Sequence, residues 1–237
     1  MANIRDAMET AEIHRKVLTA ATRLFIEKGY ERTTVLDIAK LSGIPKTKIF
    51  YEMKSKEDIL STLVTKFLDG VTAASNTVSQ QYTDDKIFIY VANEVLQIYM
   101  SEMNEDMRNL YLSGYSLHKT SESVLLRRTD IMFDIFGKMF PDFEKKDFYE
   151  IEIASMGIMR AYMTVPCDMY FTLESKAKRL VTMLLRIYKT EDKKISEALE
   201  FIEKIDFEAI AEKAVADVFN ELAIQKKNSN IQKEADK

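Results

Sequence analysis

The sequence is poor in residues that cross-link or interrupt a chain. Its 237 residues include a single cysteine, so no disulfide can form within the chain, and only three prolines and six glycines. No apolar run reaches the roughly 20 residues needed to cross a bilayer, and the N-terminus lacks the apolar core of a signal peptide. Helix-forming residues are abundant, and no segment alternates as a β-strand does. These features predict an all-α protein of the reducing cytoplasm that does not contact a membrane.

The net charge alone argues against a nucleic-acid-binding protein, because it is −4. The charges are unevenly distributed, however. Residues 1–60 contain 11 lysines and arginines and 9 acidic residues, whereas the remainder contains 23 and 29. Within residues 32–56, six basic residues accompany two acidic ones. A small basic surface on an acidic body is compatible with a local DNA contact, although random clustering on a solvated surface would give the same counts.

The first 80 residues carry the start and stop signals of four helices. Polar residues that cap helix N-termini alternate with glycines that end helices, and apolar residues recur between them at helical spacing. A first helix is expected over 12–28 and ends before Gly29, and a second lies between its cap residues, Thr34 with Asp37, and Gly43. Pro45 lies in the first turn of a third helix. Ser55 and Asp58 begin a fourth helix, which continues through Gly70.

Three short helices with this punctuation predict a helix-turn-helix. Ala39 is small where a larger side chain would hold the second and third helices apart. Gly43 lies at the turn, where a left-handed backbone is expected. Ile49 faces back toward the second helix, and Met53 extends the same buried face by one turn. The spacing alone is weak evidence, because a generic three-helix packing unit would also show it.

If the third helix buries its apolar side, its polar side chains are exposed. The N-terminal residues of such a helix enter the major groove of DNA, where lysine donates to guanine and threonine contacts a base or a thymine methyl group. Lysines and helix N-termini also bind phosphates. The predicted partner is therefore double-stranded DNA, contacted through Thr34, Lys46, Thr47, Lys48, Tyr51, Lys54 and Lys56.

The stretch from about Ile13 to Leu60 resembles the TetR (tetracycline-repressor-like) family. It contains AATRLFIEKGYERTTVLDIAKLSGIPKTKIFYEMKSKEDIL, which follows without gaps the family pattern F-x-x-x-G-[YF], T-[TS]-x-x-[DE]-I-A-x-x-[AS]-G and K-E-x-L. The chain departs from the pattern at three positions of the third helix. Phe50 lacks a hydroxyl that often reaches phosphate, Glu52 puts a carboxylate near the DNA-facing side, and Met53 replaces a phenylalanine.

The resemblance implies a homodimer that binds a palindromic operator and acts as a transcriptional repressor. In this family a larger helical domain holds a small effector, whose binding changes the distance between the two DNA-reading heads and releases the DNA. Two late helices pair with those of the partner in a four-helix bundle, a role that we assign to residues 144–164 and 172–190. The expected divisions are a helix-turn-helix domain at 1–54, an effector-binding and dimerisation domain at 55–225, and a disordered polar tail at 226–237.

Sparse breakers divide the larger domain into helices at 85–102, 105–118, 121–139, 144–164, 172–190 and 195–224. The last of these would cover an effector pocket or extend the dimer interface. Methionine and aromatic residues are frequent in this domain, and methionine suits adaptable apolar pockets, although core packing explains any one of them more simply. The predicted lipophilic effector site consists of Tyr99, Met103, Met107, Tyr111, Phe133, Phe136, Met159, Tyr162 and Met163.

Few residues in the sequence suggest other chemistry. Glu94 or Glu102 would favour a cationic effector, although a surface position is the simpler expectation for each. His14 and His118 are far apart in the sequence, and Cys167 is expected to be an inert thiol. No cluster of metal ligands, phosphate-binding loop or nucleophile elbow occurs, so we expect no enzyme activity, metal or cofactor. The alternative function is a helical ligand carrier or protein-interaction module that does not bind DNA specifically.

Overall fold

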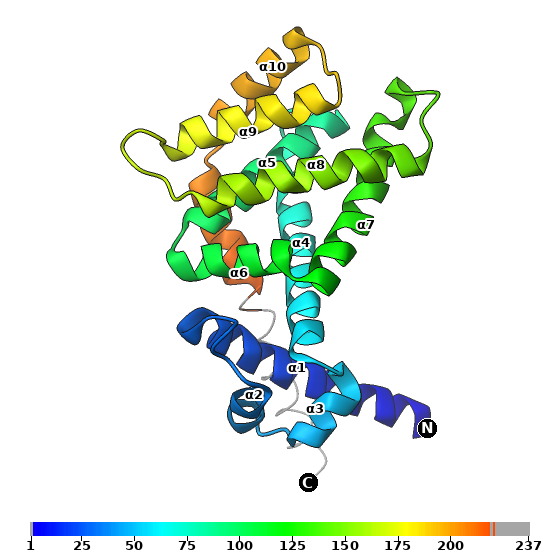
Figure 1. Cartoon of the computed structure of the whole chain (residues 1–237), viewed down its shortest axis with the longest axis vertical. Helices are drawn as coiled ribbons and strands as arrows, with labels where there is room; N and C mark the ends of the chain where they lie inside the picture. Colours follow the sequence, from blue (N-terminus) through cyan, green and yellow to red (C-terminus); the bar gives the residue numbers. More distant parts are fainter. Residues whose placement is uncertain (1, 219, 221–237) are drawn as a thin grey trace.

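The computed structural model describes residues 2–218 and 220, and every regular element among them is helical. Figure 1 shows a small N-terminal head and a larger body joined by one long helix. The head contains α1 (Ala2–Lys28), α2 (Val35–Ser42) and α3 (Lys46–Met53), and α4 (Lys56–Ser79) joins it to the body. The body contains α5 (Lys86–Glu102), α6 (Glu105–Ser116), α7 (His118–Phe136), the 3-10 turn η1 (Gly137–Met139), α8 (Lys145–Thr164), α9 (Leu173–Ile187), α10 (Asp192–Glu203) and a further helical stretch at 207–218.

The predicted helices lie close to those of the structure, with two corrections. The first helix begins at Ala2, well before residue 12. The predicted helix at 195–224 is interrupted at residues 204–206, so α10 and the stretch at 207–218 are separate. The remainder of that prediction beyond 218, apart from residue 220, and the predicted disordered tail at 226–237 lie outside the described residues.

The caps predicted in the head are present. The Thr34 hydroxyl accepts a hydrogen bond from the Asp37 backbone N–H at 3.1 Å, and the Asp37 carboxylate accepts one from the Thr34 N–H at 3.0 Å. This reciprocal pair satisfies two backbone donors that the start of α2 leaves unpaired. At the end of α2, Gly43 has a φ of +70° and donates its N–H to the Ala39 carbonyl. A side chain there would be strained, which explains the glycine.

Helix α4 belongs to the hydrophobic cores of both head and body. Near its N-terminus Ile59, Leu60 and Leu63 are fully buried, and α4 packs against α1 and α3 there. Further along, Phe67 and Val71 are buried against the body. Burying large aliphatic and aromatic side chains of this kind contributes about 1.5–3 kcal/mol each. A displacement of α4 by the body is therefore transmitted directly to the head.

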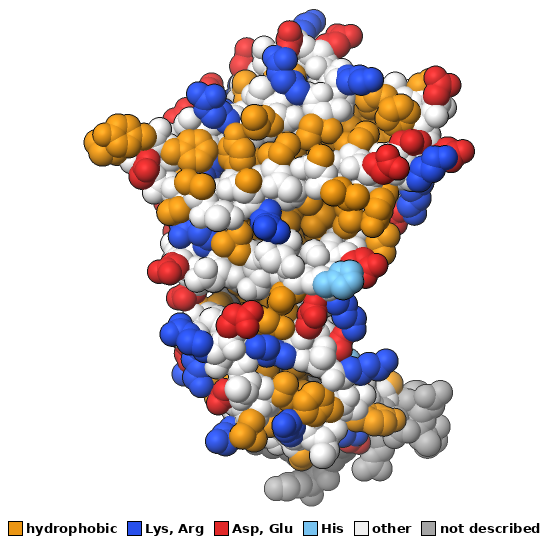
Figure 2. Space-filling view, viewed as in Figure 1, with side chains coloured by type: hydrophobic (Ala, Val, Ile, Leu, Met, Phe, Trp, Pro, Cys, Tyr) orange, Lys and Arg blue, Asp and Glu red, His pale blue; other side chains and the backbone are white. Residues whose placement is uncertain are grey.

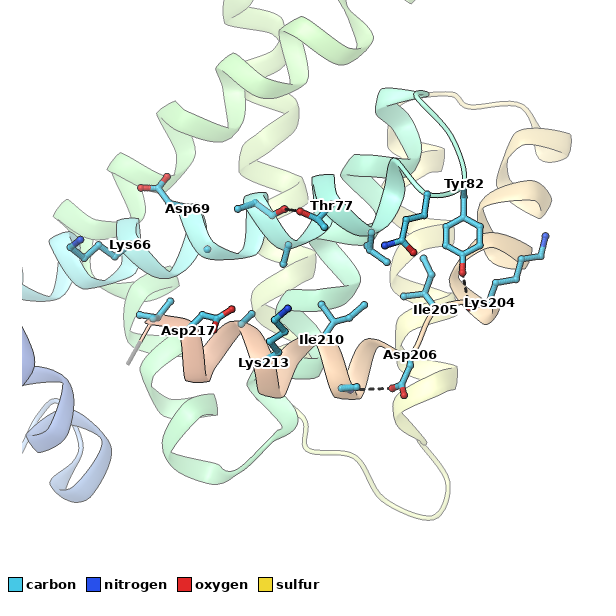
Figure 3. Close-up of a pocket in the computed structure, with 18 residues that line it drawn as sticks. Lys66, Asp69, Thr77, Tyr82, Lys204, Ile205, Asp206, Ile210, Lys213 and Asp217 are labelled. Carbon is cyan, nitrogen blue, oxygen red and sulfur yellow. Dashed lines mark hydrogen bonds between the residues drawn. The ribbon is translucent and has the colours of Figure 1, made fainter. Parts of the chain in front are cut away.

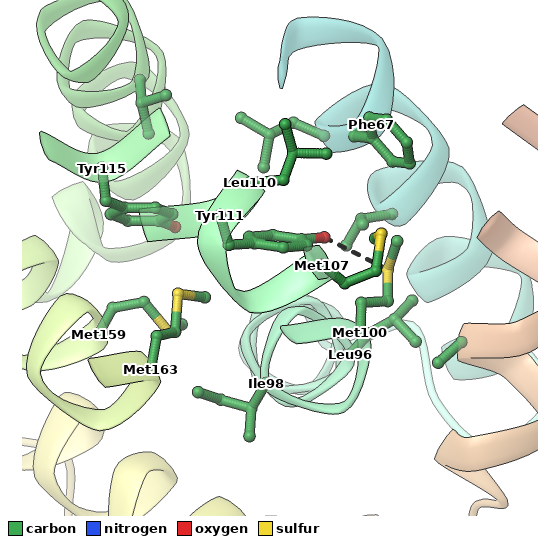
Figure 4. Close-up of a cluster of buried hydrophobic side chains, with 14 of the residues drawn as sticks. Phe67, Leu96, Ile98, Met100, Met107, Leu110, Tyr111, Tyr115, Met159 and Met163 are labelled. Atoms are coloured by element: carbon green, nitrogen blue, oxygen red, sulfur yellow. Dashed lines mark hydrogen bonds between the residues drawn. The ribbon is translucent and has the colours of Figure 1, made fainter. Parts of the chain in front are cut away.

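The centre of the body is filled by methionine and aromatic side chains. Figure 4 shows Met107 and Tyr111 of α6 packed over α5 beside Met159 and Met163 of α8. The Tyr111 hydroxyl contacts the Met100 sulfur at 3.4 Å. Among the described residues, no helix has both the length and the apolar character required to cross a membrane.

Candidate nucleic-acid interface and effector site

Helix α3 presents one exposed polar face at the end of the molecule remote from the body (Figure 1). Its opposite face is buried through Ile49 and Met53, which are 1% and 5% exposed. Both burials confirm the predicted inner side of the helix. The exposed positions follow the helical repeat and include Tyr51, which is 79% exposed, and the half-exposed Phe50. The exposed residues are Lys46, Thr47, Phe50, Tyr51 and Lys54.

Phe50 is a surface residue that the predicted DNA-contacting set omitted. Its ring is 41% exposed, and the Lys46 ammonium lies 5.5 Å from the ring centroid. The Phe50 ring lacks the hydroxyl that often reaches phosphate, which explains the omission. Its spacing of four residues from Lys46 could have placed it on the exposed face. In the major groove, an exposed aromatic edge suits contact with a thymine methyl group.

Two of the predicted DNA contacts use their polar groups within the head. The Lys56 ammonium donates to the Tyr30 carbonyl at 2.9 Å and lies 4.0 Å from the centroid of the Tyr30 ring. Burial raises the pKa of the Tyr30 hydroxyl to about 12, so this ring remains neutral. The Thr34 hydroxyl is engaged in the cap of α2. Both side chains therefore hold the head together in this structure.

Lys48 lies at the margin of the exposed face of α3, beside α1. Its ammonium is 3.7 Å from the carboxylates of both Glu9 and Glu52. Glu52 also lies 3.6 Å from the His14 imidazole. These distances exceed those of close ion pairs, and Lys48 is about 41% exposed. Lys48 can therefore turn toward DNA more readily than Lys56 can.

The predicted effector residues do not surround one cavity. Met107, Tyr111, Phe136, Met159 and Met163 are buried core side chains. In contrast, Met103 and Phe133 are 38% and 43% exposed, Tyr99 packs on Phe207, and Tyr162 packs on Phe171. The structure thus places these residues in different surroundings, and the effector site stays a prediction, because helical spacing identifies apolar side chains without showing which of them border empty space.

A small, partly open cavity of about 70 Å³ lies instead among α4, α5, α6 and α7. Its lining combines apolar side chains with two amides, the Glu94 carboxylate and the guanidinium groups of Arg127 and Arg128. Gln97 accepts a hydrogen bond from the Tyr115 hydroxyl at 2.7 Å and donates one to Asn93 at 2.9 Å. The lining residues include Leu68, Ile89, Asn93, Glu94, Val124 and Met132.

Both glutamates for which a surface position was expected are withdrawn from solvent. Glu94 is 2% exposed, and the Glu102 side chain is 6% exposed. Glu94 lines the cavity and accepts a hydrogen bond from Arg128 at 2.7 Å. Glu102, two turns further along α5, pairs with Lys176 at 2.7 Å and Arg108 at 2.8 Å. The expectation failed because each carboxylate has a partner on a helix distant in sequence, Arg128 for Glu94 and Lys176 for Glu102.

A larger and more open groove runs between α4 and the helical stretch at 207–218 (Figure 3). Its volume is about 930 Å³, and charged side chains of both signs line it. At one end the Tyr82 hydroxyl donates to the Lys204 carbonyl at 3.3 Å. At the other, a Cβ atom on Gly70 would lie 3.1 Å from Val218, so glycine permits the close approach of this stretch to α4. The second part of the predicted 195–224 helix thus braces α4.

An apolar surface extends over α8 and α9. Figure 2 shows hydrophobic side chains gathered along these helices. On α8, Tyr149 and Ile153 are 36% and 54% exposed, and Met183 of α9 is 48% exposed. Gly157 has no neighbour within 4 Å of where a Cβ would lie. Large apolar residues beside a small one form a surface on which another helix can pack closely.

The fold and the exposed face of α3 define a helix-turn-helix DNA-binding protein with a separate helical body. Residues 17–63 match the family described as "Bacterial regulatory proteins, tetR family". The chain is 27% identical over 182 residues to the probable HTH-type transcriptional regulator YttP of Bacillus subtilis, covering 74% of this chain and 79% of that protein. It is 32% identical over 60 residues to the regulator TtgR of Pseudomonas putida, covering 25% and 29% of the respective chains.

The architecture has a counterpart among solved structures. The structure of RolR in complex with the ligand resorcinol matches with a TM-score of 0.60 over 82% of this chain and 95% of that chain, at 16% identity. This likeness concerns the fold. Residues 17–63 thus match the DNA-binding region of the TetR family, and the chain is a DNA-binding transcriptional regulator similar to members of that family.

Proposed function

We propose that the protein is a repressor that binds a palindromic operator as a homodimer and is released from it by a small lipophilic effector. The observation that carries the proposal is the exposed face of α3, on which Lys46, Thr47 and Tyr51 lie together while Ile49 and Met53 are buried. A helix held in this way can enter the major groove without unfolding. Lys46 and Thr47 lie in its first turn, where base edges are read.

The apolar surface of α8 and α9 supports the dimer. An exposed surface that includes Tyr149, Ile153 and Met183 is costly in water. The isologous packing of two such surfaces buries both and forms a four-helix bundle. The two-fold axis of that dimer relates the two α3 helices, and a palindromic operator has the same symmetry. The predicted dimer helices at 144–164 and 172–190 correspond to α8 and α9.

The cavity among α4 to α7 supports the effector. Its 70 Å³ is well below the roughly 300 Å³ of a pocket for a drug-sized ligand. An effector must therefore move the surrounding helices apart, and Leu68 and Thr72 of α4 belong to the wall. Because α4 continues into the head, such an opening would shift α3 relative to its partner in the dimer. RolR, a protein of the same fold, binds the small phenol resorcinol.

Duplex binding by α3 variants tests this function. The parent protein and the variants Lys46→Ala and Tyr51→Ala are titrated with the DNA upstream of their own gene by fluorescence anisotropy at several salt concentrations. We expect Tyr51→Ala to weaken binding by about tenfold at this operator, and Lys46→Ala to lower the salt slope by about one.

The matched control is Lys146→Ala, which removes the same charge from a side chain that is 72% exposed at the start of α8, in the body. It should bind DNA like the parent. Parental binding by both α3 variants would exclude α3 as the reading helix. If the parent binds small lipophiles but shows no salt-dependent DNA binding, the ligand-carrier alternative is correct.

A further inference from the structure

One oxygen of the buried Glu94 carboxylate has no hydrogen-bond partner among the described residues. Oε1 accepts from the Arg128 guanidinium at 2.7 Å, whereas Oε2 is buried and unpartnered. A buried acceptor left without a hydrogen bond destabilises the folded state. Glu94 also lines the cavity among α4 to α7. A buried acceptor that borders a cavity is a place where a ligand can donate a hydrogen bond.

The charges around this oxygen leave room for one additional cation. Arg128 is the cation that pairs with both Glu94 and Glu152, so two carboxylates share one guanidinium. Glu152 is fully engaged, because its second oxygen accepts from the Tyr188 hydroxyl. The third donor of Arg128 goes to the Ser155 hydroxyl at 3.0 Å. Arg127, which also lines the cavity, pairs with Asp69 at 2.6 Å. When Glu94 and Glu152 are both ionised, the site therefore carries one uncompensated negative charge, and the unpartnered oxygen belongs to Glu94.

The rest of the cavity favours an organic cation over a metal ion. No cluster of three or more metal-binding side chains occurs in the part of the chain that the structure describes. Apolar side chains make up much of the remaining wall and include Leu68, Ile89, Val124 and Met132. Hydrocarbon packs favourably on such a wall, whereas a hydrated metal ion does not.

We propose that the effector is a lipophilic organic ammonium compound whose N–H donates to Glu94 Oε2 and whose hydrocarbon part packs against the apolar side chains of the cavity. This inference rests on the proposed function, since it names the chemical class of the effector. Glu94 neutralises the positive charge of the ammonium group, and the hydrocarbon part of the ligand separates α4 from α7. Binding therefore stabilises an expanded body, which is the state that displaces the head.

Isothermal titration calorimetry with two probes of similar size and shape tests whether the effector is an organic ammonium compound. Phenethylamine and phenethyl alcohol have the same hydrocarbon part, and only the first is cationic near neutral pH. We expect the parent protein to bind the amine at least about tenfold more tightly than the alcohol. Glu94→Gln keeps the size of the side chain and should abolish this preference. Glu122→Gln, an exposed position on α7, removes an equal charge and should keep it.

The proton balance gives a second readout. Burial raises the pKa of Glu94 more than Arg128 lowers it, so a proton and an ammonium ion compete for this carboxyl. The other ionisable groups facing Glu94 are Arg128, Glu152, Tyr90 and Tyr115. The affinity for the amine should therefore fall as the pH decreases in the parent and not in Glu94→Gln.

Equal affinity for amine and alcohol, binding of neither probe, or an amine preference that survives in Glu94→Gln would overturn the inference. Duplex binding is measured on the same preparations. A parent protein that binds its operator but shows no amine preference refutes the effector class alone. An amine preference in a protein that does not bind the operator refutes the proposed function alone.

Discussion

Helix α5 carries two carboxylates that are both removed from water but have different surroundings. Glu102 accepts from Lys176, Arg108 and the Cys167 backbone N–H. Burial raises the pKa of this carboxyl, but these donors outweigh burial and hold the pKa below its usual value. Glu94 has one cationic partner, which it shares, and burial raises its pKa. The Glu102 carboxylate is therefore saturated, in the sense that both of its oxygens accept hydrogen bonds, whereas the Glu94 carboxylate has one oxygen without a donor.

The comparison separates a structural ion cluster from a candidate ligand site. Burial alone does not distinguish them, because both side chains are nearly inaccessible. The number of hydrogen-bond donors on each carboxylate oxygen does distinguish the two sites. The Glu102 cluster also anchors the loop between α8 and α9, since Lys176 donates to the Val165 carbonyl and Cys167 donates to Glu102. The charges of the Glu102 cluster thus hold this loop in place, whereas the uncompensated charge at Glu94 pairs with no further group among the described residues.

Removal of the shared cation should have the largest effect on stability. Arg128→Met leaves two buried carboxylates without a cation, and we expect it to lower the free energy of unfolding by about 5 kcal/mol. Lys176→Met leaves Glu102 with Arg108 and a backbone donor, so its loss should be smaller, about 3 kcal/mol. Urea unfolding at a fixed protein concentration measures both. A larger loss for Lys176→Met would contradict the assignment of Glu102 as the saturated carboxylate.

Neutralising Glu102 should lower the free energy of unfolding more than neutralising Glu94. Glu102→Gln leaves the fully buried Lys176 without a carboxylate, which should cost about 3 kcal/mol. Glu94→Gln leaves Arg128 paired one-to-one with Glu152, so we expect a change within about 1 kcal/mol of the parent. The same unfolding measurement decides, with the exposed Glu122→Gln as the control. Equal losses would show that Glu94 is as structurally committed as Glu102.

The head was largely predictable from sequence because its signals are local. The Thr34 and Asp37 cap, the glycine at 43 and the burial of Ile49 and Met53 each depend on residues within a few positions of one another. The groups that the lysine side chains contact could not be predicted from such local signals. Lys56 reaches Tyr30, which is 26 residues away, and no local pattern reports such a contact.

The body was predictable as a set of helices but not as a site. Helical periodicity identifies which residues share a face, but it does not show which faces meet. Glu94 was therefore expected at the surface, although Arg128 and Glu152 lie on two other helices that cover it. The same limit applies to the predicted methionine and aromatic site, of which Met159 and Met163 are buried in the core.

The smallest predicted effect is also the most specific, because the two carboxylates should give pH dependences of opposite sign. Glu94 has a raised pKa in the folded protein, so between the unfolded and folded values the folded state binds more protons, and stability falls as pH rises. Glu102 has a lowered pKa, so its contribution is complete above the unfolded value and is lost as pH falls through the folded one.

Unfolding free energies measured from acidic to neutral pH should show both signs, each with a slope of at most about 1.4 kcal/mol per pH unit. Relative to Glu94→Gln, the parent should become less stable as pH increases above the ordinary glutamate range. Relative to Glu102→Gln, it should become less stable as pH decreases below that range. Differences of the same sign for both variants would mean that the two clusters do not differ in donor saturation, and the case for Glu94 as the ligand-binding carboxylate would lose its physical basis.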